Sequence, residues 1–172
     1  MYSEKILELF KSPINAGGLQ GANAIGKYVD SSCGDNVKIY LKIDEDGIIS
    51  EARFKAMGAV GTIVASSAIC SCAIGCKIDE SLQINAERII EITGEYPQDK
   101  KYCIDFSIKA LALAIEDYFV KLEKAQKKAE KQPAEEKAVT KQPEKSNLEV
   151  NPVANERRAV SAAKAAFDAM FE

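Results

Sequence analysis

The chain has 172 residues, 47% of them apolar, so it can bury one modest hydrophobic core and carries extra sequence beyond it. Its net charge of -3 and pI near 5.3 argue against a general nucleic-acid binder, which needs a basic surface to displace phosphate counterions, and do not favour acidic partners either. The N-terminus lacks the segments of a signal peptide and no apolar run reaches membrane-spanning length, so we expect a cytoplasmic protein without membrane contact.

The N-terminal third of the chain predicts a short helix followed by loops and a strand. Ile6, Leu7 and Phe10 share one face at helical spacing over residues 3–10, and Pro13 ends the pattern. The stretch 15–35 is rich in glycine, asparagine and aspartate, which indicates loops around an irregular strand at 24–29.

The next segment predicts a β-hairpin. Apolar and polar residues alternate over 37–43 with a period of two, as in a half-buried strand. Glu45, Asp46 and Gly47 make the turn, and 48–57 continues as a second strand. We therefore expect a small antiparallel sheet.

Helices are predicted after the hairpin. Residues 59–74 are small and mostly uncharged, which favours a buried helix on the sheet, although their β-branched members also fit a strand. Asp79 is predicted to cap a short helix, and a helix over 86–92 ends before Gly94. From Lys100 to Leu122 the apolar spacing predicts a long helix that closes the core.

Three regions follow from this pattern. Residues 1–124 form the predicted compact domain, and 125–153 form a charged flexible linker because Lys, Glu and Pro replace the apolar residues. Residues 154–172 form an amphipathic helix capped by Asn155, which either packs on the domain or binds a partner.

Two of the five cysteines stand in places suited to metal or sulfur chemistry. The chain has no histidine, and in a reducing compartment its cysteines are expected to be thiols or metal ligands. Cys33 lies in the run Ser32-Cys33-Gly34-Asp35, and Cys103 lies near the start of the long helix, where the helix dipole favours a thiolate. A thiolate is both a nucleophile and a ligand for thiophilic metals, so both residues are candidate site residues.

The other three cysteines lie in the predicted helix 59–74 or just after it. On a helix Cys72 and Cys76 share a face, whereas Cys70 is turned about 200° from Cys72, so the three cannot bind one metal together. Two interpretations stay open: packing as small apolar side chains, or an auxiliary thiol pair.

Six short segments, taken in their order and spacing, resemble the IscU/NifU family of iron-sulfur cluster assembly scaffolds. The resemblance covers residues 1–121 and implies an α+β fold, a small antiparallel sheet with helices packed on one side, which agrees with the order of strands and helices above. The segments are Tyr2–Lys5, Pro13–Gly17, Gly21–Ala24, Ser32–Asp35, Ala52–Lys55 and Ala65–Ser67.

The resemblance implies a carrier and not an enzyme. It implies that Cys33, Asp35 and Cys103 hold iron or a labile [2Fe-2S] cluster, that a cysteine desulfurase supplies the sulfur, and that apo iron-sulfur proteins receive the cluster. An aspartate oxygen binds iron more weakly than a thiolate does, which keeps such a site labile.

The chain departs from the family pattern at two positions. Ala59, after Gly58, stands where the family usually has its second cysteine, and Tyr102 stands where a histidine often precedes the third. A homodimer or a partner's cysteine could complete the site. Two alternatives remain: a degenerate paralogue acting as an interaction or regulatory module, and a zinc-binding form of the fold.

Overall fold

The computed structural model describes residues 1–130. The chain divides into two units, Met1–Tyr118 and Phe119–Glu172, and helix α5 (Tyr102–Glu130) begins in the first and ends in the second. The helix continues beyond its predicted end at Leu122, so residues 125–130 of the predicted linker are helical. Lys, Glu, Gln and Ala are strong helix formers and extend a helix without an apolar face. The rest of that linker and the helix predicted at 154–172 lie outside the described residues.

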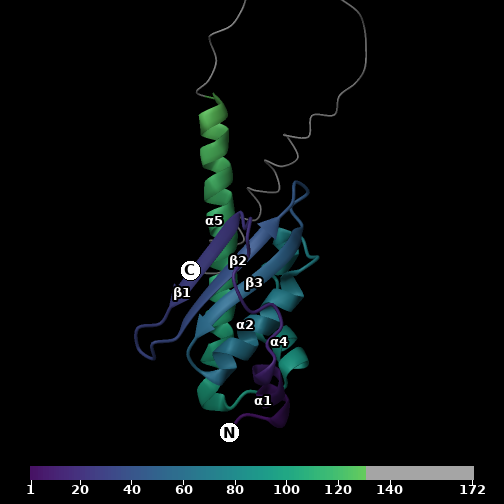
Figure 1. Cartoon of the computed structure of the whole chain (residues 1–172), viewed down its shortest axis with the longest axis vertical. Coiled ribbons are helices and arrows are strands. Elements are labelled where there is room, and N and C mark those ends of the chain that lie inside the picture. The colour runs from purple at the N-terminus through teal and green to yellow at the C-terminus, as the bar shows by residue number, and fades with distance from the viewer. Residues whose placement is uncertain (131–172) are drawn as a thin grey trace, which may run out of the picture. The chain divides into compact units, whose positions relative to one another are not determined.

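The first unit contains the predicted antiparallel sheet. Its strands are β1 (Ala24–Val29), β2 (Asn36–Ile43) and β3 (Ile49–Met57), in the order β1-β2-β3 (Figure 1). Alternate residues of β2 point into the core, as the period-two pattern predicts. The buried members of that set are Val37, Ile39, Leu41 and Ile43.

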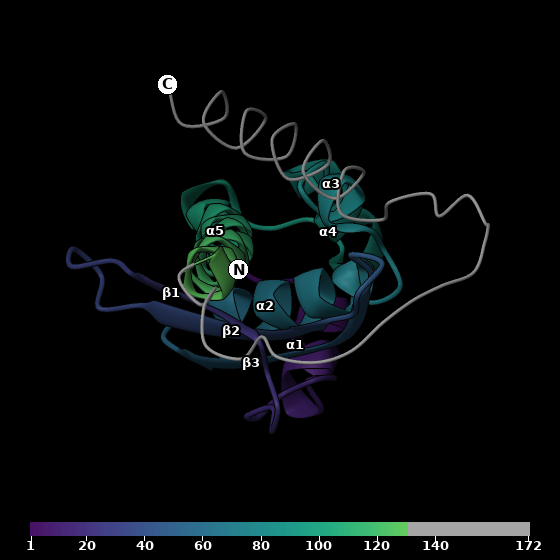
Figure 2. The ribbon, with the colours of Figure 1, turned by 90° about the horizontal axis from the view of Figure 1, so that it is seen from above.

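Helices cover one face of this sheet. Figure 2 shows α2 (Val60–Ala73) and the beginning of α5 on the same side of the strands. Helix α1 (Glu4–Lys11) packs against α2 and α4 (Ala86–Thr93). The segment 59–74 is therefore a helix, and the strand alternative for it is wrong. The α+β class with helices on one side of a small sheet is confirmed.

Strand β1 and helix α5 approach each other closely. A Cβ on Gly26 would overlap the backbone of Ala110 and Ala114 in α5, so only glycine fits there. Beside this contact, the Asp117 carboxylate accepts a hydrogen bond of 2.9 Å from the Ile25 backbone N–H. A backbone donor of an edge strand is thereby satisfied by a side chain of the helix.

The caps set the helix boundaries. Ser3 accepts a hydrogen bond from Ile6 N–H at the start of α1, and α4 ends at Gly94, whose φ of 88° suits glycine. The prediction that Asp79 caps the short helix α3 (Ile78–Ser81) is wrong, because Asp79 lies in the first turn of that helix. The Glu80 carboxylate instead accepts from the Lys77 backbone N–H at 3.0 Å. Among the described residues no helix combines the length and apolarity that crossing a membrane requires.

Candidate functional site

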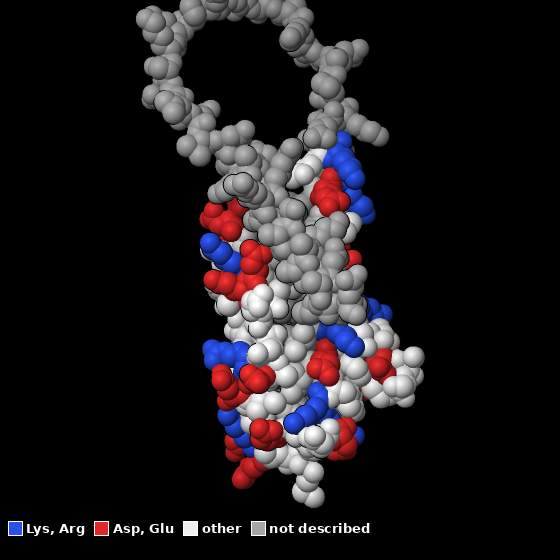
Figure 3. All heavy atoms as spheres, turned by 180° about the vertical axis from the view of Figure 1, so that it is seen from behind, with Lys and Arg blue, Asp and Glu red and all other residues white. Residues whose placement is uncertain are grey.

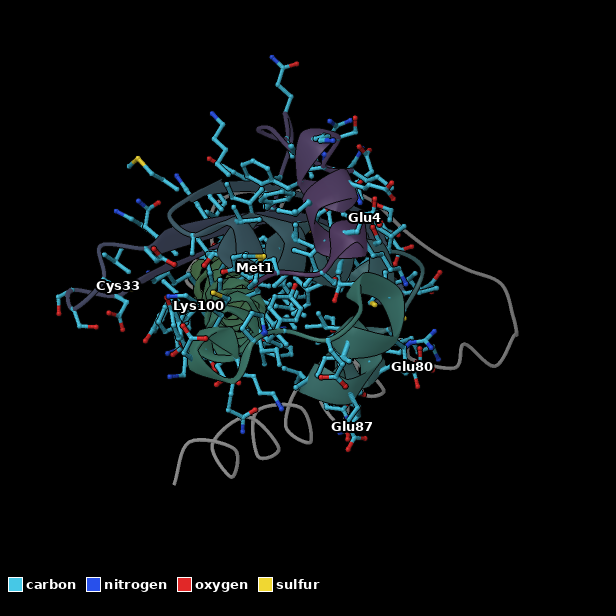
Figure 4. The ribbon with its side chains drawn as sticks, turned by 90° about the horizontal axis from the view of Figure 1, so that it is seen from below. Met1, Glu4, Cys33, Glu80, Glu87 and Lys100 are labelled. Carbon is cyan, nitrogen blue, oxygen red and sulfur yellow. The ribbon has the colours of Figure 1, made fainter. Side chains whose placement is uncertain are left out.

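Cys33 lies at the exposed tip of the loop between β1 and β2. Asp30 N–H donates to the Asp35 carbonyl at 2.9 Å and Gly34 N–H donates to the Asp30 carbonyl at 3.0 Å, which closes the loop. Gly34 has a φ of 75°, a conformation that favours glycine. Figure 4 shows Cys33 on the side of the molecule opposite Glu80 and Glu87. The loop therefore presents this thiol to solvent and to any partner that approaches it.

Asp30 organises this loop and was not identified from the sequence. Its carboxylate accepts hydrogen bonds from the Ser32 and Cys33 backbone N–H groups at 2.8 and 3.1 Å, and from the Ser32 hydroxyl. The Cys33 thiol lies 3.5 Å from the same carboxylate oxygen. The hydrogen bonds, first that of the Ser32 hydroxyl, lower the pKa of Asp30. Asp followed two residues later by Ser is a pattern typical of an Asx turn, and Asp30 and Ser32 show that pattern in the sequence.

Asp35 faces the N-terminus of α2 and is only 4% exposed. Its carboxylate accepts hydrogen bonds from the Ala59 backbone N–H at 3.2 Å and from the Thr62 hydroxyl at 2.6 Å. Ala59, the N-cap residue of α2, has no side chain that can cap the helix. Asp35 therefore caps α2 from a distant part of the chain, where the positive end of the helix dipole favours its charge.

Cys103 is the second residue of α5, as predicted, and its thiol is buried. A Cβ on Gly61 would lie 3.1 Å from the Cys103 sulfur, so α2 approaches the thiol closely through a glycine. Burial raises the pKa of Cys103, while the neighbouring hydroxyl groups of Thr62 and Tyr2 oppose that rise. The predicted preference of the helix N-terminus for a thiolate is thus outweighed by desolvation.

Buried hydroxyl groups connect α2 to α5 behind the thiol. The Ser66 hydroxyl donates to the Thr62 carbonyl at 2.7 Å and lies 3.1 Å from the Ser107 hydroxyl. Ser107 in turn donates to the Cys103 carbonyl at 3.3 Å. Thr62, Ser66 and Ser107 are fully buried, and sequence reasoning missed all three. The signal for Thr62 and Ser66 was a pair of hydroxyl residues four apart in an otherwise apolar helix.

Three tyrosines surround Cys103. Burial raises the pKa of Tyr2 and of Tyr96 to about 12, and also raises the pKa of Tyr102, so all three phenols are neutral at pH 7. The Tyr2 and Tyr96 rings meet edge to face at 6.4 Å, and neither buried hydroxyl has a partner with hydrogen-bond geometry among the described residues. The Lys100 ammonium lies 5.8 Å from the centre of the Tyr102 ring.

The structure brings two of the three predicted ligands together. Asp35 and Cys103 share Thr62 as a neighbour, and both are close enough to Tyr102 to raise its pKa, as is Cys33. Across the described part of the chain, however, no three cysteine or carboxylate side chains already converge on one metal position. The arrangement is a buried thiol and carboxylate with an exposed thiol on a nearby loop.

The other cysteines lie toward the far end of α2. Cys70 is fully buried, and desolvation raises the pKa of its thiol to about 12, which supports its role as a small apolar side chain. Cys72 is half-buried, and burial raises its pKa although Arg88 opposes that shift. The Cys76 thiol donates to the Cys72 carbonyl at 3.2 Å, so these two remain neighbours.

The sheet, the helices and these thiols define a small α+β protein that gathers cysteine and aspartate at one end of a three-stranded sheet. The chain belongs to the NifU-like N terminal domain family, whose model matches residues 1–125.

Similar proteins carry scaffold and nitrogen-fixation names. The chain is 37% identical over 118 residues to the nitrogen fixation protein NifU of Azotobacter chroococcum, covering 68% of this chain and 38% of that protein. It is 35% identical over 121 residues to the iron-sulfur cluster assembly scaffold protein IscU 1 of Archaeoglobus fulgidus, covering 70% of this chain and 78% of the relative. The chain thus spans well under half of the NifU protein and most of the IscU protein.

Solved structures share the fold. A putative scaffold protein for the SUF system from Fervidobacterium islandicum superposes with a TM-score of 0.56 at 22% identity, covering 66% of this chain and 96% of that one. The N-terminal part of a NifU-like protein from Brucella abortus gives a TM-score of 0.54 at 22% identity, covering 69% of this chain and 94% of that one.

Proposed function

We propose that this protein is an iron-sulfur cluster assembly scaffold, a carrier and not an enzyme, that works in the cytoplasm. Its cargo is iron or a labile [2Fe-2S] cluster, held by Cys33, Asp35 and Cys103 and passed to apo iron-sulfur proteins. The observation that carries the proposal is the exposed Cys33 thiol on a loop next to the buried Asp35 and Cys103 pair.

Each of the three residues has a distinct part in this proposal. Cys33 is exposed, so it can attack the outer sulfur of a cysteine desulfurase persulfide; the new sulfur-sulfur bond forms on Cys33 and the donor leaves as its thiolate. Cys103 supplies a second thiolate ligand from a buried position, once the metal displaces its proton. Asp35 supplies an oxygen ligand that is already engaged by Ala59 and Thr62, so it binds the cargo weakly.

The donor set is incomplete by one thiolate. Ala59 adjoins Asp35 through its backbone N–H, and Tyr102 offers a neutral phenol, a poor iron ligand. A fourth ligand from a second copy of the chain or from a partner's cysteine would complete a cluster. Such sharing fits a site that must release its cargo.

The test is anaerobic reconstitution of the full-length protein with ferrous iron, cysteine and a cysteine desulfurase, followed by iron, zinc and sulfide analysis. We expect a weakly held, oxygen-sensitive cluster that Cys33→Ala or Cys103→Ala removes. The matched control is Cys72→Ser with Cys76→Ser, which removes two thiols outside the site and should retain the cargo. Absence of iron and sulfide in the wild type would favour the interaction module, and zinc without sulfide would favour the zinc-binding form.

Adding a thiol at the family's second cysteine position tests the same site through a gain in cluster lifetime. Ala59→Cys places a sulfur beside Asp35, so we expect a longer lifetime of the cluster in air, by about tenfold if one more thiolate joins the ligand set. The measurement is the decay of visible absorbance after exposure to oxygen. An unchanged lifetime would mean that another donor already occupies the fourth position.

A further inference from the structure

The sheet has a second face, which points away from α2 and carries its own pattern of side chains. The strand register aligns these outward residues in rows that cross all three strands. Figure 1 shows α2 behind the strands, so this outer face is turned toward the viewer. The rows are Val29, Asn36 and Met57; then Lys27, Lys38 and Lys55; then Ile25, Tyr40 and Arg53.

The middle row places three positive charges side by side. Lys27 pairs with Lys38, and Lys38 pairs with Lys55, in the direct cross-strand register where like charges destabilise a sheet. None of the three forms an ion pair within the described residues, whereas Lys42 in a neighbouring row is paired with Glu51 at 3.4 Å. Lysines on edge strands prevent sheet aggregation, which can account for Lys27 in β1. It does not account for Lys38 in the central strand, nor for Lys55, because β3 is hydrogen-bonded at Phe54 to residues 15–17.

The row nearest the candidate site adds exposed apolar surface. Met57 is 68% exposed and Val29 is 53% exposed, and they flank Asn36 in the same row. Met57 is followed by Gly58 and Ala59 at the start of α2, and Val29 by the loop that carries Cys33. The basic row and this apolar row therefore form one continuous surface, here called the outer patch, that borders the site.

The outer patch differs from the rest of the molecule in its charge. The whole chain carries a net charge of -3, and on the helical side, seen in Figure 3, red and blue side chains alternate over the described surface. The outer rows next to the site contain Lys27, Lys38, Lys55 and Arg53 and no carboxylate. A local positive field on an acidic protein attracts a negatively charged partner to one place and orientation.

We propose that the outer patch docks an acidic protein partner, whose carboxylates face the lysine row and whose apolar side chain packs on Met57 and Val29. From strand and residue spacing the Cα atoms of the patch span about 10 by 7 Å, the scale of a short, transient contact. A protein is favoured over a nucleic acid because the chain as a whole repels polyanions and because Met57 and Val29 need an apolar counterpart. The proposal concerns a partner surface and does not depend on cluster binding.

The test uses full-length protein and three soluble ligands: a twelve-residue peptide of alternating Glu and Leu, a twelve-residue poly-Glu peptide, and poly(U) RNA. Binding is measured by fluorescence anisotropy at two salt concentrations, and the contact is located by backbone amide NMR shifts. We expect the Glu/Leu peptide to bind most tightly, to weaken with salt, and to shift the amides of residues 27, 38, 55 and 57.

Lys38→Glu is the decisive variant, with Lys5→Glu on exposed α1 as the control of equal charge change. Lys38→Glu should weaken the Glu/Leu peptide about tenfold, and it should raise the melting temperature because it places a carboxylate between Lys27 and Lys55. Lys5→Glu should do neither. Met57→Ser should weaken the Glu/Leu peptide and leave poly-Glu binding unchanged.

Several results would overturn the proposal. The first two are an absence of Glu/Leu peptide binding and a loss of peptide affinity in Lys5→Glu equal to that in Lys38→Glu. The third is binding of poly(U) at the same amides more tightly than the peptide binds, and the fourth is sedimentation of a dimer that Lys38→Glu dissociates. The third would make the outer patch an RNA surface and the fourth an interface between two copies of this chain.

Discussion

The two ends of helix α2 lie beside cysteines in contrasting surroundings. At its N-terminal end, Asp35 accepts hydrogen bonds from Ala59 and Thr62, and Thr62 also adjoins the Cys103 thiol. At its C-terminal end, Cys70 is packed in the core and Cys76 donates to a backbone carbonyl. One end is built around a buried carboxylate and hydroxyl groups, and the other around apolar packing and backbone carbonyl acceptors.

This difference shows how the same residue type receives different chemistry from its surroundings. Backbone N–H groups and the positive end of the helix dipole stabilise a carboxylate or a bound anion at the N-terminal end. At the C-terminal end, burial raises the pKa of the Cys70 and Cys72 thiols, and the negative end of the helix dipole also disfavours a thiolate there. Burial raises the pKa of Cys103 as well, so what distinguishes the N-terminal end is the carboxylate and the hydroxyl group that lie beside its thiol.

Among the variants that test this contrast between the two ends of α2, Gly58→Ala should have the largest effect on stability. Gly58 has a φ of 145°, and a Cβ there would overlap the Asp35 carboxylate. We expect a loss of roughly 2–4 kcal/mol in the free energy of unfolding, because the strained backbone and the displaced carboxylate both contribute. Urea denaturation measures it. Gly34→Ala is the control, since Gly34 also has a positive φ but its Cβ would meet no atom within 4 Å. Equal losses in both variants would show that the Asp35 contact contributes nothing.

Thr62→Val should have a smaller effect, confined to the N-terminal end. The variant leaves the buried Asp35 carboxylate without its hydroxyl donor, which costs about 1–3 kcal/mol. Thr62→Ser keeps the hydroxyl and should recover most of that loss in urea denaturation. At the other end of the helix, Ser71→Ala removes an exposed hydroxyl and should change stability little. If Thr62→Ser is as unstable as Thr62→Val, the methyl packing and not the hydrogen bond is responsible.

Cys70→Ala should change the pH dependence of stability. The folded-state pKa of Cys70 is raised from 9.0 to about 12, so the folded protein holds this proton more tightly than the unfolded chain does. The resulting contribution to stability is complete below pH 9 and is lost as the pH rises toward 12. The wild type should therefore lose melting temperature more steeply than Cys70→Ala over this window in thermal melts. Parallel curves would mean that the Cys70 thiol is not desolvated as the structure indicates.

Truncation after Lys124 should have the smallest effect. Both ends of α2 lie in the unit Met1–Tyr118, and the compact domain is predicted to end at residue 124. We expect the melting temperature to change by no more than about 2 °C and the iron content to stay the same. Thermal unfolding and metal analysis of the truncated and full-length proteins provide the check. A large fall in melting temperature would move the domain boundary toward the C-terminus.

Local patterns were sufficient for most of the elements. Alternation over 37–43 predicted the central strand, and the small apolar residues after Gly58 predicted a buried helix. The end of α5 was missed because helix propensity continues where the apolar face stops. The cap of α3 was assigned to Asp79 because any acidic residue near a helix start satisfies the sequence pattern, whereas the actual contact depends on where Glu80 reaches.

By itself, the sequence determined the α+β class and the order of strands and helices, because these follow from periodicity. Its resemblance to the IscU/NifU family proposed Cys33, Asp35 and Cys103 as candidate ligands. Only the tertiary structure decided that Asp35 caps α2, that Thr62 joins it to Cys103, and that three lysines form one row across the sheet. Each of these contacts joins residues distant in the chain, and their meeting is set by strand register and by how helices pack on the sheet. A net charge of -3 likewise concealed a basic face, since a sum over the chain carries no information on position.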